Sequence, residues 1–147
     1  MIDKKWIGEE VSNLSTDVEK GQLRFFARTV GETDPIYTDE DAARAAGYRS
    51  LPAPPTFLFS LNLAQSDPLG KYLKIGVDLA RLLHGGQEFE YYKPICAGDR
   101  ITLKSRVVDI VEKKGGALEL LFEETTATNQ HNELVGRMKQ SLVIRHG

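Results

Sequence analysis

The sequence contains little of what marks several common classes of protein. Its single cysteine, Cys96, excludes an internal disulfide framework and a paired-cysteine metal clip. The 19 basic and 21 acidic residues are mixed along the chain, with a formal net charge of -2, so there is no basic stripe of the kind that binds nucleic acid. No apolar run approaches the roughly 20 residues that a membrane-spanning helix needs. We therefore expect neither nucleic acid nor a membrane as a partner.

Targeting and metal-binding signals are also missing. Lys4 and Lys5 are not followed by the apolar run of a signal peptide, which predicts a cytoplasmic protein. The histidines at positions 131 and 146 have no companion ligands at the spacing of a metal site. We expect neither a metal nor a cofactor.

What the sequence does contain is enough material for one globular domain. Of its 147 residues, 41% are apolar and 27% are charged, which are ordinary values for a soluble protein with a core. We find no internal repeat, no low-complexity segment and no linker between domains. The whole chain, residues 1–147, is predicted to form a single domain.

The first part of the chain, up to about residue 65, has the spacing of helices. Apolar side chains repeat at helical intervals over 18–30, with Thr16 or Asp17 available as an N-cap and Gly31 as a stop. A shorter helix is predicted over 38–46. The segment that follows the prolines, residues 56–64, is apolar on nearly every side, which is typical of a buried helix.

From about Leu82 onward the apolar period becomes two, which predicts strands. Residues 113–116 and 130–133 have the composition of hairpin turns. The predicted fold is therefore α+β, with an antiparallel sheet of at least four strands covered by the helix at 56–64. The apolar face of that sheet is predicted to carry Ile101, Leu103, Val107, Val111, Leu118, Leu120, Phe122, Leu134, Met138, Leu142 and Ile144.

Three segments together carry a resemblance to a known family. They are 25–37, which ends in Gly-Glu-Thr-Asp-Pro-Ile-Tyr, 52–57, which reads Pro-Ala-Pro-Pro-Thr-Phe, and 83–94, followed by Gly98-Asp99. In this order they resemble the MaoC-like (R)-specific hydratases and dehydratases, and most of all the FAS1-like dehydratase domains. That group includes the non-catalytic partner subunits of mycobacterial hydroxyacyl-carrier-protein dehydratases. The resemblance implies the hot-dog fold, a long antiparallel sheet wrapped around a central apolar helix.

The resemblance also implies a catalytic loop. Active members of the family carry an Asp and a His on a loop that reads roughly Asp-x-Asn-Pro-x-His. Hydration of a conjugated thioester needs one group to activate water, another to deliver a proton and a donor for the carbonyl oxygen. Alignment on Pro35 puts Glu32 at the position of the Asp and Tyr37 at the position of the His. These two residues are candidate catalytic groups, and His84 is a third because histidine titrates in the useful range.

The substitutions change what the loop can do. A tyrosine with an ordinary pKa of about 10 is a poor base near neutral pH. Pro54 and Pro55 stand where the family has His-Gly and have no N–H, so an oxyanion hole would need the amides of Thr56 or Phe57. The candidate substrate-binding residues are Asp34, Pro35, Thr56, Phe57, Gly85 and Gly86.

Each candidate also has a purely structural interpretation. Glu32 can be a solvated loop acid, Tyr37 a packing residue and Asp34 the first residue of a turn with Pro35. His84 can satisfy the backbone where a strand begins. The two glycines after it allow the close approach of either another backbone or a ligand.

Three functions remain open from the sequence. The first is an (R)-specific 3-hydroxyacyl-thioester dehydratase or enoyl-CoA hydratase, or a subunit of one, that is, a lyase of fatty-acid or acyl-CoA metabolism. The second is a non-catalytic subunit that binds the acyl chain and pairs with a catalytic hot-dog partner. The third, more distant, is an acyl-CoA thioesterase. In each case the resemblance implies an acyl-CoA or acyl-carrier-protein thioester as ligand, and a homodimer or a heterodimer with another hot-dog subunit.

Overall fold

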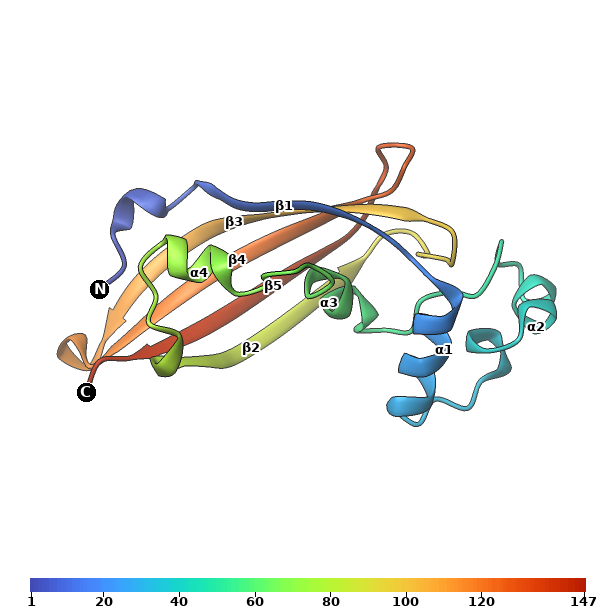
Figure 1. Ribbon diagram of the computed structural model, residues 1–147, viewed down its shortest axis with the longest axis horizontal. Helices are drawn as coiled ribbons and strands as arrows, with labels where there is room; N and C mark the ends of the chain where they lie inside the picture. The colour runs from blue at the N-terminus through green and yellow to red at the C-terminus, as the bar shows by residue number, and fades with distance from the viewer.

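A five-stranded antiparallel sheet forms the body of the protein in the computed structural model, which describes residues 1–147 (Figure 1). The strands lie in the order β1-β3-β4-β5-β2, so β1 and β2 are its two edges. Their bounds are Glu10–Asp17 for β1, Leu82–Tyr91 for β2, Arg100–Lys113 for β3, Leu118–Thr128 for β4 and Leu134–Arg145 for β5. The predicted hairpin turns join β3 to β4 and β4 to β5.

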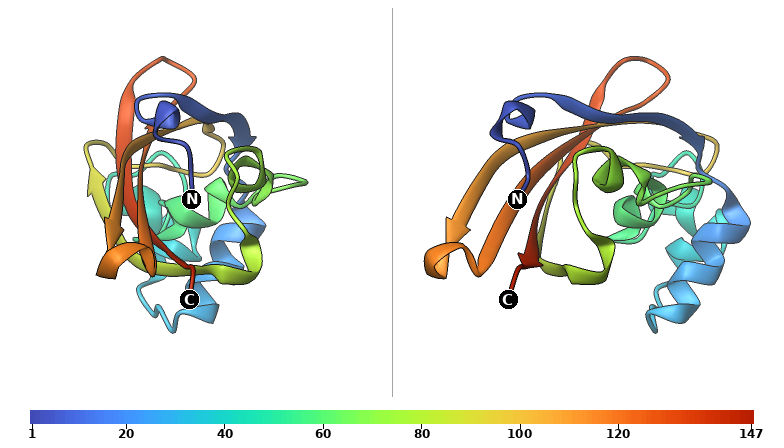
Figure 2. Two further views of the ribbon diagram at one scale, coloured as in Figure 1. Left: turned by 90° about the vertical axis from the view of Figure 1, so that its left-hand side faces the viewer. Right: turned by 60° about the vertical axis from the view of Figure 1, so that its left-hand side comes forward.

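The sheet curves around the central helix α3 (Phe57–Asn62), as Figure 2 shows. Helices α1 (Lys20–Thr29) and α2 (Glu40–Ala45) lie together beyond one end of the sheet, and α4 (Gly70–Lys74) lies against it farther along (Figure 1). This is the α+β hot-dog arrangement that the sequence predicts. None of these helices is long and apolar enough to cross a membrane.

Strand β1 is the main element that the sequence analysis missed. It places Thr16 and Asp17 in the sheet, so neither caps α1, which begins at Lys20 after Glu19. Val11 is the only buried residue of β1, and its two apolar side chains, Val11 and Leu14, are three residues apart instead of two. A strand that lacks alternating apolar residues is not recognised from the periodicity of its sequence.

The predicted apolar face is correct for the first half of β3 and for Met138, Leu142 and Ile144 of β5, and wrong for the rest of β3, for β4 and for Leu134, which is exposed. Ile101, Leu103 and Val107 are fully buried as expected, but the register then shifts between Val107 and Asp109. The extra residue of this β-bulge turns Ile110 inward in place of Val111. On β4 the buried residues are Glu119, Leu121, Glu123, Thr125 and Ala127, whereas Leu118, Leu120 and Phe122 are only partly buried on the other face.

Two apolar clusters fill the space under the sheet. The larger joins Phe57, Leu58 and Leu61 of α3 to the sheet near the first half of β3. The second surrounds Tyr72 of α4 and Leu121 of β4. Between them the inner face of the sheet is polar, with Ser105 opposite Thr125 and Glu123 opposite Gln140. The apolar core is therefore interrupted along β3, β4 and β5 by a polar band that crosses the middle of the sheet.

Candidate functional site

The candidate site is a pocket of about 320 Å³ at the N-terminal end of α3. Prolines form much of its wall because three of them precede the helix, and tyrosines together with Lys93 supply its polar groups. The lining residues are Tyr37, Tyr48, Pro52, Ala53, Pro54, Pro55, Leu58, Tyr91, Tyr92, Lys93, Pro94 and Ile95. All three segments that carry the family resemblance contribute to this pocket.

The loop before the pocket is held by its own acidic side chains. Glu32 Oε1 accepts hydrogen bonds from the amides of Thr33, at 2.9 Å, and Asp34, at 3.0 Å. Asp34 Oδ1 in turn accepts from the amide of Ile36 at 3.1 Å and caps a short 3-10 turn over Pro35–Tyr37. The structural roles considered for Asp34 and Pro35 are thus present. Neither Glu32 nor Asp34 lines the pocket.

Tyr37 extends from the end of this turn into the pocket. Partial burial raises the pKa of its phenol, and the negative charges of Glu32 and Asp34 raise it further. The pKa rises because burial and both negative charges disfavour the charged phenolate. Tyr37 therefore stays protonated near neutral pH, where it can donate a hydrogen bond but cannot take up a proton.

The two amides expected to form an oxyanion hole already have acceptors. The amide of Thr56 donates to the hydroxyl oxygen of Tyr91 at 3.0 Å, and the amide of Phe57 donates to the carbonyl of Pro54 at 3.1 Å. Thr56 itself has a φ of 74°, in the left-handed region that β-branched residues rarely occupy. A substrate carbonyl would have to displace Tyr91 before it could use the Thr56 amide.

His84 lies in a different place from Glu32 and Tyr37. It lines a second pocket farther along α3, with its ring 5.8 Å from that of Phe59 and its Nε2 3.2 Å from Gln87 Oε1. Of the three catalytic candidates, only Tyr37 lines the pocket at the N-terminal end of α3; Glu32 lies on the loop before it, and His84 lines the second pocket.

Gly85 and Gly86 permit a close approach between strands. The register between β2 and β5 shifts at this point, which leaves Gly85 as the additional residue of a bulge. A Cβ on Gly85 would lie 3.1 Å from the Ser141 carbonyl oxygen, and one on Gly86 would lie 3.0 Å from Ser141 Oγ. What these glycines approach within the chain is therefore the backbone and side chains of β5.

Three tyrosines of the pocket, Tyr48, Tyr91 and Tyr92, were not proposed as site residues from the sequence. Tyr48 follows α2, and Tyr91 ends β2, where alternation places it on the same face as Phe89. The rings of Phe89 and Tyr91 are stacked, with centroids 6.1 Å apart. The alternation of β2 was the available signal for Tyr91. Tyr48 comes from a loop, where no local pattern marks it.

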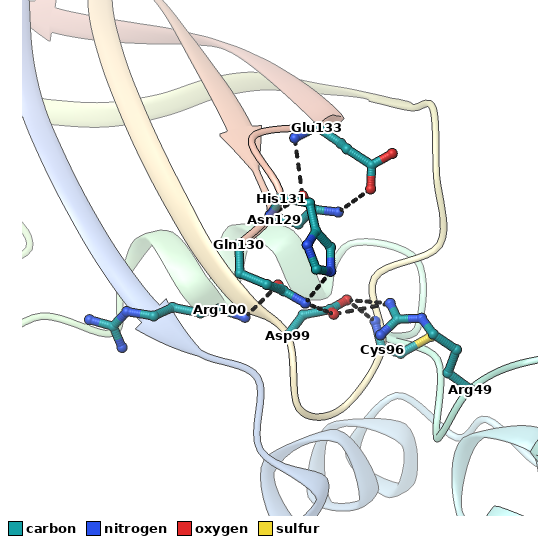
Figure 3. Close-up of polar contacts among 8 residues, drawn as sticks. All are labelled: Arg49, Cys96, Asp99, Arg100, Asn129, Gln130, His131 and Glu133. Atoms are coloured by element: carbon teal, nitrogen blue, oxygen red, sulfur yellow. Dashed lines mark hydrogen bonds and ion pairs between the residues drawn. The ribbon is translucent and has the colours of Figure 1, made fainter.

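A buried carboxylate fixes the turn that follows the pocket, as Figure 3 shows. Asp99 is 1% exposed and accepts from the Cys96 amide at 2.9 Å, from Arg49 Nη2 at 3.0 Å and from Gln130 Nε2 at 3.1 Å. These contacts join the β2–β3 connection to the β4–β5 hairpin and to the loop before the prolines. The Gly98-Asp99 pair of the resemblance therefore holds three segments around one side of the pocket.

The fold and the pocket define a hot-dog protein of the dehydratase type. The family model described as "FAS1-like, dehydratase domain region" matches residues 5–138, and the chain belongs to this family. It is 41% identical over 145 residues to a UPF0336 protein of Streptomyces griseus subsp. griseus, covering 98% of this chain and 95% of that protein.

Solved structures agree with this assignment. The C-terminally truncated HadBC (3R-hydroxyacyl-ACP dehydratase) complex of Mycobacterium tuberculosis is similar, with a TM-score of 0.76 and 27% identity over 88% of this chain and 90% of that chain. A MaoC-like dehydratase has a TM-score of 0.82 and 25% identity over 95% of this chain. This chain spans 42% of that longer protein.

Proposed function

We propose that the protein is a subunit of an (R)-specific 3-hydroxyacyl-thioester dehydratase of fatty-acid or acyl-CoA metabolism. In this assignment it binds the acyl thioester, and a hot-dog partner subunit supplies the catalytic Asp and His. The observation that carries the proposal is that the groups needed for catalysis are engaged within the chain. The Glu32 carboxylate holds its own loop, Tyr37 stays protonated, and the Thr56 amide is bonded to Tyr91.

The pocket supports binding of an acyl thioester. Proline and leucine side chains give it an apolar wall, and the phenols of Tyr37, Tyr48 and Tyr91 give it donors. The pKa of Tyr91 is raised by burial, so this phenol too stays protonated at neutral pH. A few fixed donors in an apolar cleft suit a ligand with one carbonyl and an aliphatic chain. The only ionisable side chain of the lining besides the tyrosines, Lys93, is ion-paired with Glu133, so the pocket offers no group that is free to act as a base.

An exposed sheet edge supports the role of a partner. β2 pairs only with β5, so its other side is open, and it leads directly into Tyr91 and Tyr92 of the pocket, each 44% exposed. An open edge strand is normally covered or paired. The solved HadBC dehydratase is, by its name, a complex. A partner placed along β2 would lie beside the pocket.

The test is hydration of a short trans-2-enoyl-CoA, followed as loss of enoyl absorbance. We expect no turnover from the purified chain and saturable turnover when it is co-expressed with a MaoC-like subunit that carries the intact Asp-x-Asn-Pro-x-His loop. In that complex Glu32→Gln should leave kcat within about twofold, because Glu32 is assigned no proton transfer. The matched change in the partner, Asp→Asn in its loop, should abolish turnover. Turnover by the chain alone that disappears in Glu32→Gln would overturn the proposal.

That outcome would establish a second candidate, a hydratase that acts by itself. One observation favours it: Glu32 and Tyr37 are five residues apart on one short loop, and the negative charge of Glu32 helps to raise the pKa of the Tyr37 phenol. Release of free thiol from a saturated acyl-CoA, measured in the same samples, would instead indicate a thioesterase.

A further inference from the structure

A second pocket lies at the C-terminal end of α3 and is separate from the site described above. Its volume is about 290 Å³, near the lower end of the range of small-molecule sites. Its outer part is apolar and accessible, since Leu63 and Leu69 are 44% and 43% exposed. Its inner part is polar and is formed by Asn62, Lys71, Tyr72 and Gln140, all of them buried.

The polar end of the pocket contains an ion pair shielded from water. Lys71 Nζ lies 2.5 Å from Glu123 Oε1, and the two side chains are 6% and 0% exposed. Gln140 Nε2 donates to the same carboxylate oxygen at 2.8 Å and to the Tyr72 hydroxyl at 2.5 Å. The Lys71 ammonium also lies 4.9 Å from the centroid of the Tyr72 ring. These contacts hold the inner wall in one arrangement.

Two buried acceptors at this end have no partner. They are Asn62 Oδ1, whose residue lines the pocket and is 5% exposed, and Glu123 Oε2, whose residue pairs with Lys71 but does not itself line the pocket. Buried polar atoms are nearly always hydrogen-bonded, so an unpaired acceptor in the wall of a pocket points to a donor that arrives from outside the chain. An ammonium is disfavoured there because it would lie beside the ammonium of Lys71. A hydroxyl is suitable, because it donates one hydrogen bond and can accept another.

We infer that the second pocket is a binding site for a short alkyl chain that bears a hydroxyl group. The hydroxyl donates to Asn62 Oδ1 and accepts from an N–H of Lys71, and the alkyl chain lies along Phe59, Leu82 and Leu142. Nothing in this inference requires catalysis or a partner subunit, so it is independent of the proposed function.

The test uses 1-hexanol and its methyl ether, 1-methoxyhexane, as probes of the full chain. The ether keeps the alkyl chain and the oxygen but lacks the donor. Binding is followed by NMR through the side-chain amides of Asn62 and Gln140. We expect the alcohol to bind at least about fivefold more tightly than the ether, the preference that one hydrogen bond typically confers.

Variants separate the polar contact from the pocket itself. Asn62→Leu should bring the two probes to equal affinity, whereas Asn13→Leu, on the exposed edge strand β1, should leave the preference intact. Leu69→Trp at the accessible mouth leaves the buried network unchanged and should weaken both probes together. It also provides the test if Asn62→Leu does not fold. Equal binding of the two probes to the wild-type chain, or no change in either amide up to the solubility limit of the alcohol, would overturn the inference and indicate water as the only occupant.

Discussion

At the scale of single residues, the buried pair formed by Lys71 and Glu123 makes the stability of the protein depend on pH. Burial raises the pKa of the Glu123 carboxyl above its ordinary value of 4.5, although Lys71 and Gln140 act in the opposite direction. A carboxyl with a raised pKa in the folded state holds its proton more tightly there than in the unfolded chain. Ionisation therefore costs stability, and the loss grows as the pH rises from 4.5 through the raised value.

This predicts a difference in pH dependence between the wild type and the double variant Lys71→Met/Glu123→Gln. The free energy of unfolding of the wild type should fall relative to the double variant between pH 4.5 and 8, by about 1.4 kcal/mol for each pH unit that separates the folded and unfolded pKa values. Lys71→Met alone leaves the carboxylate buried without its partner, and should cost about 3 kcal/mol at pH 7. Urea unfolding across this pH range measures all three. Parallel pH profiles for the wild type and the double variant would contradict a raised pKa of Glu123 in the folded protein.

At the scale of elements, Asp99 joins three segments of the chain through its side chain. Its two oxygens bind the turn at Cys96, the Arg49 side chain and Gln130 of the β4–β5 hairpin. An amide in the same place would put N–H groups against donors. We predict that Asp99→Asn lowers the free energy of unfolding by about 2–3 kcal/mol, the range for hydrogen bonds to a charged group.

The matched control for that change is Asp17→Asn. Asp17 also pairs with an arginine, Arg100, at 2.9 Å, but its side chain is 65% exposed. An exposed pair of this kind contributes less than about 1 kcal/mol. Equal effects of the two substitutions, measured by urea unfolding, would show that Asp99 has no special role.

How far the sequence predicts these elements depends on whether the information is local. The antiparallel sheet, both hairpins and the buried helix follow from periodicity and turn composition, and the structure confirms them. The buried face of β4 was wrong because Glu119 and Glu123 are satisfied by Ile2, His146, Lys71 and Gln140, all distant in sequence. The bulge after Val107 was likewise not visible, since it depends on pairing with β4.

The same distinction applies to the site. The loop with Glu32 and Tyr37 was found from a contiguous motif, and the structure places Tyr37 in the pocket. That the Thr56 amide is bonded to Tyr91 could not be foreseen, because these residues are 35 positions apart. Whether Glu32, Tyr37 and His84 have catalytic roles stays a prediction, for which the hydration assay is the measurement.

At the scale of the whole molecule, two apolar clusters share three strands. β3, β4 and β5 each contribute residues to both clusters across the polar band between them. Strands that run through both regions couple their unfolding. Trp6, the only tryptophan, packs against the second cluster and so reports on that end of the sheet.

We therefore predict a single cooperative unfolding transition. Urea midpoints from Trp6 fluorescence and from far-UV circular dichroism should coincide, as they do for two-state domains. Leu58→Ala, in the first cluster, should lower both midpoints equally, although it is remote from the tryptophan. A Trp6 transition that does not move with the circular dichroism would show that the polar band divides the molecule into two folding units.

The only thiol of the chain, that of Cys96, lies beside the first pocket, at the N-terminal end of α3. Cys96 is 1% exposed, pairs as an isolated bridge with Pro52, and has its pKa raised by burial. In the closed protein such a thiol is inert to alkylating reagents, since neither access nor the thiolate is available. The rate at which Cys96 is alkylated therefore measures how often the pairing of Cys96 with Pro52 opens. The native protein thus contains its own probe of pocket opening. A ligand bound against the prolines would lower the rate of Cys96 alkylation.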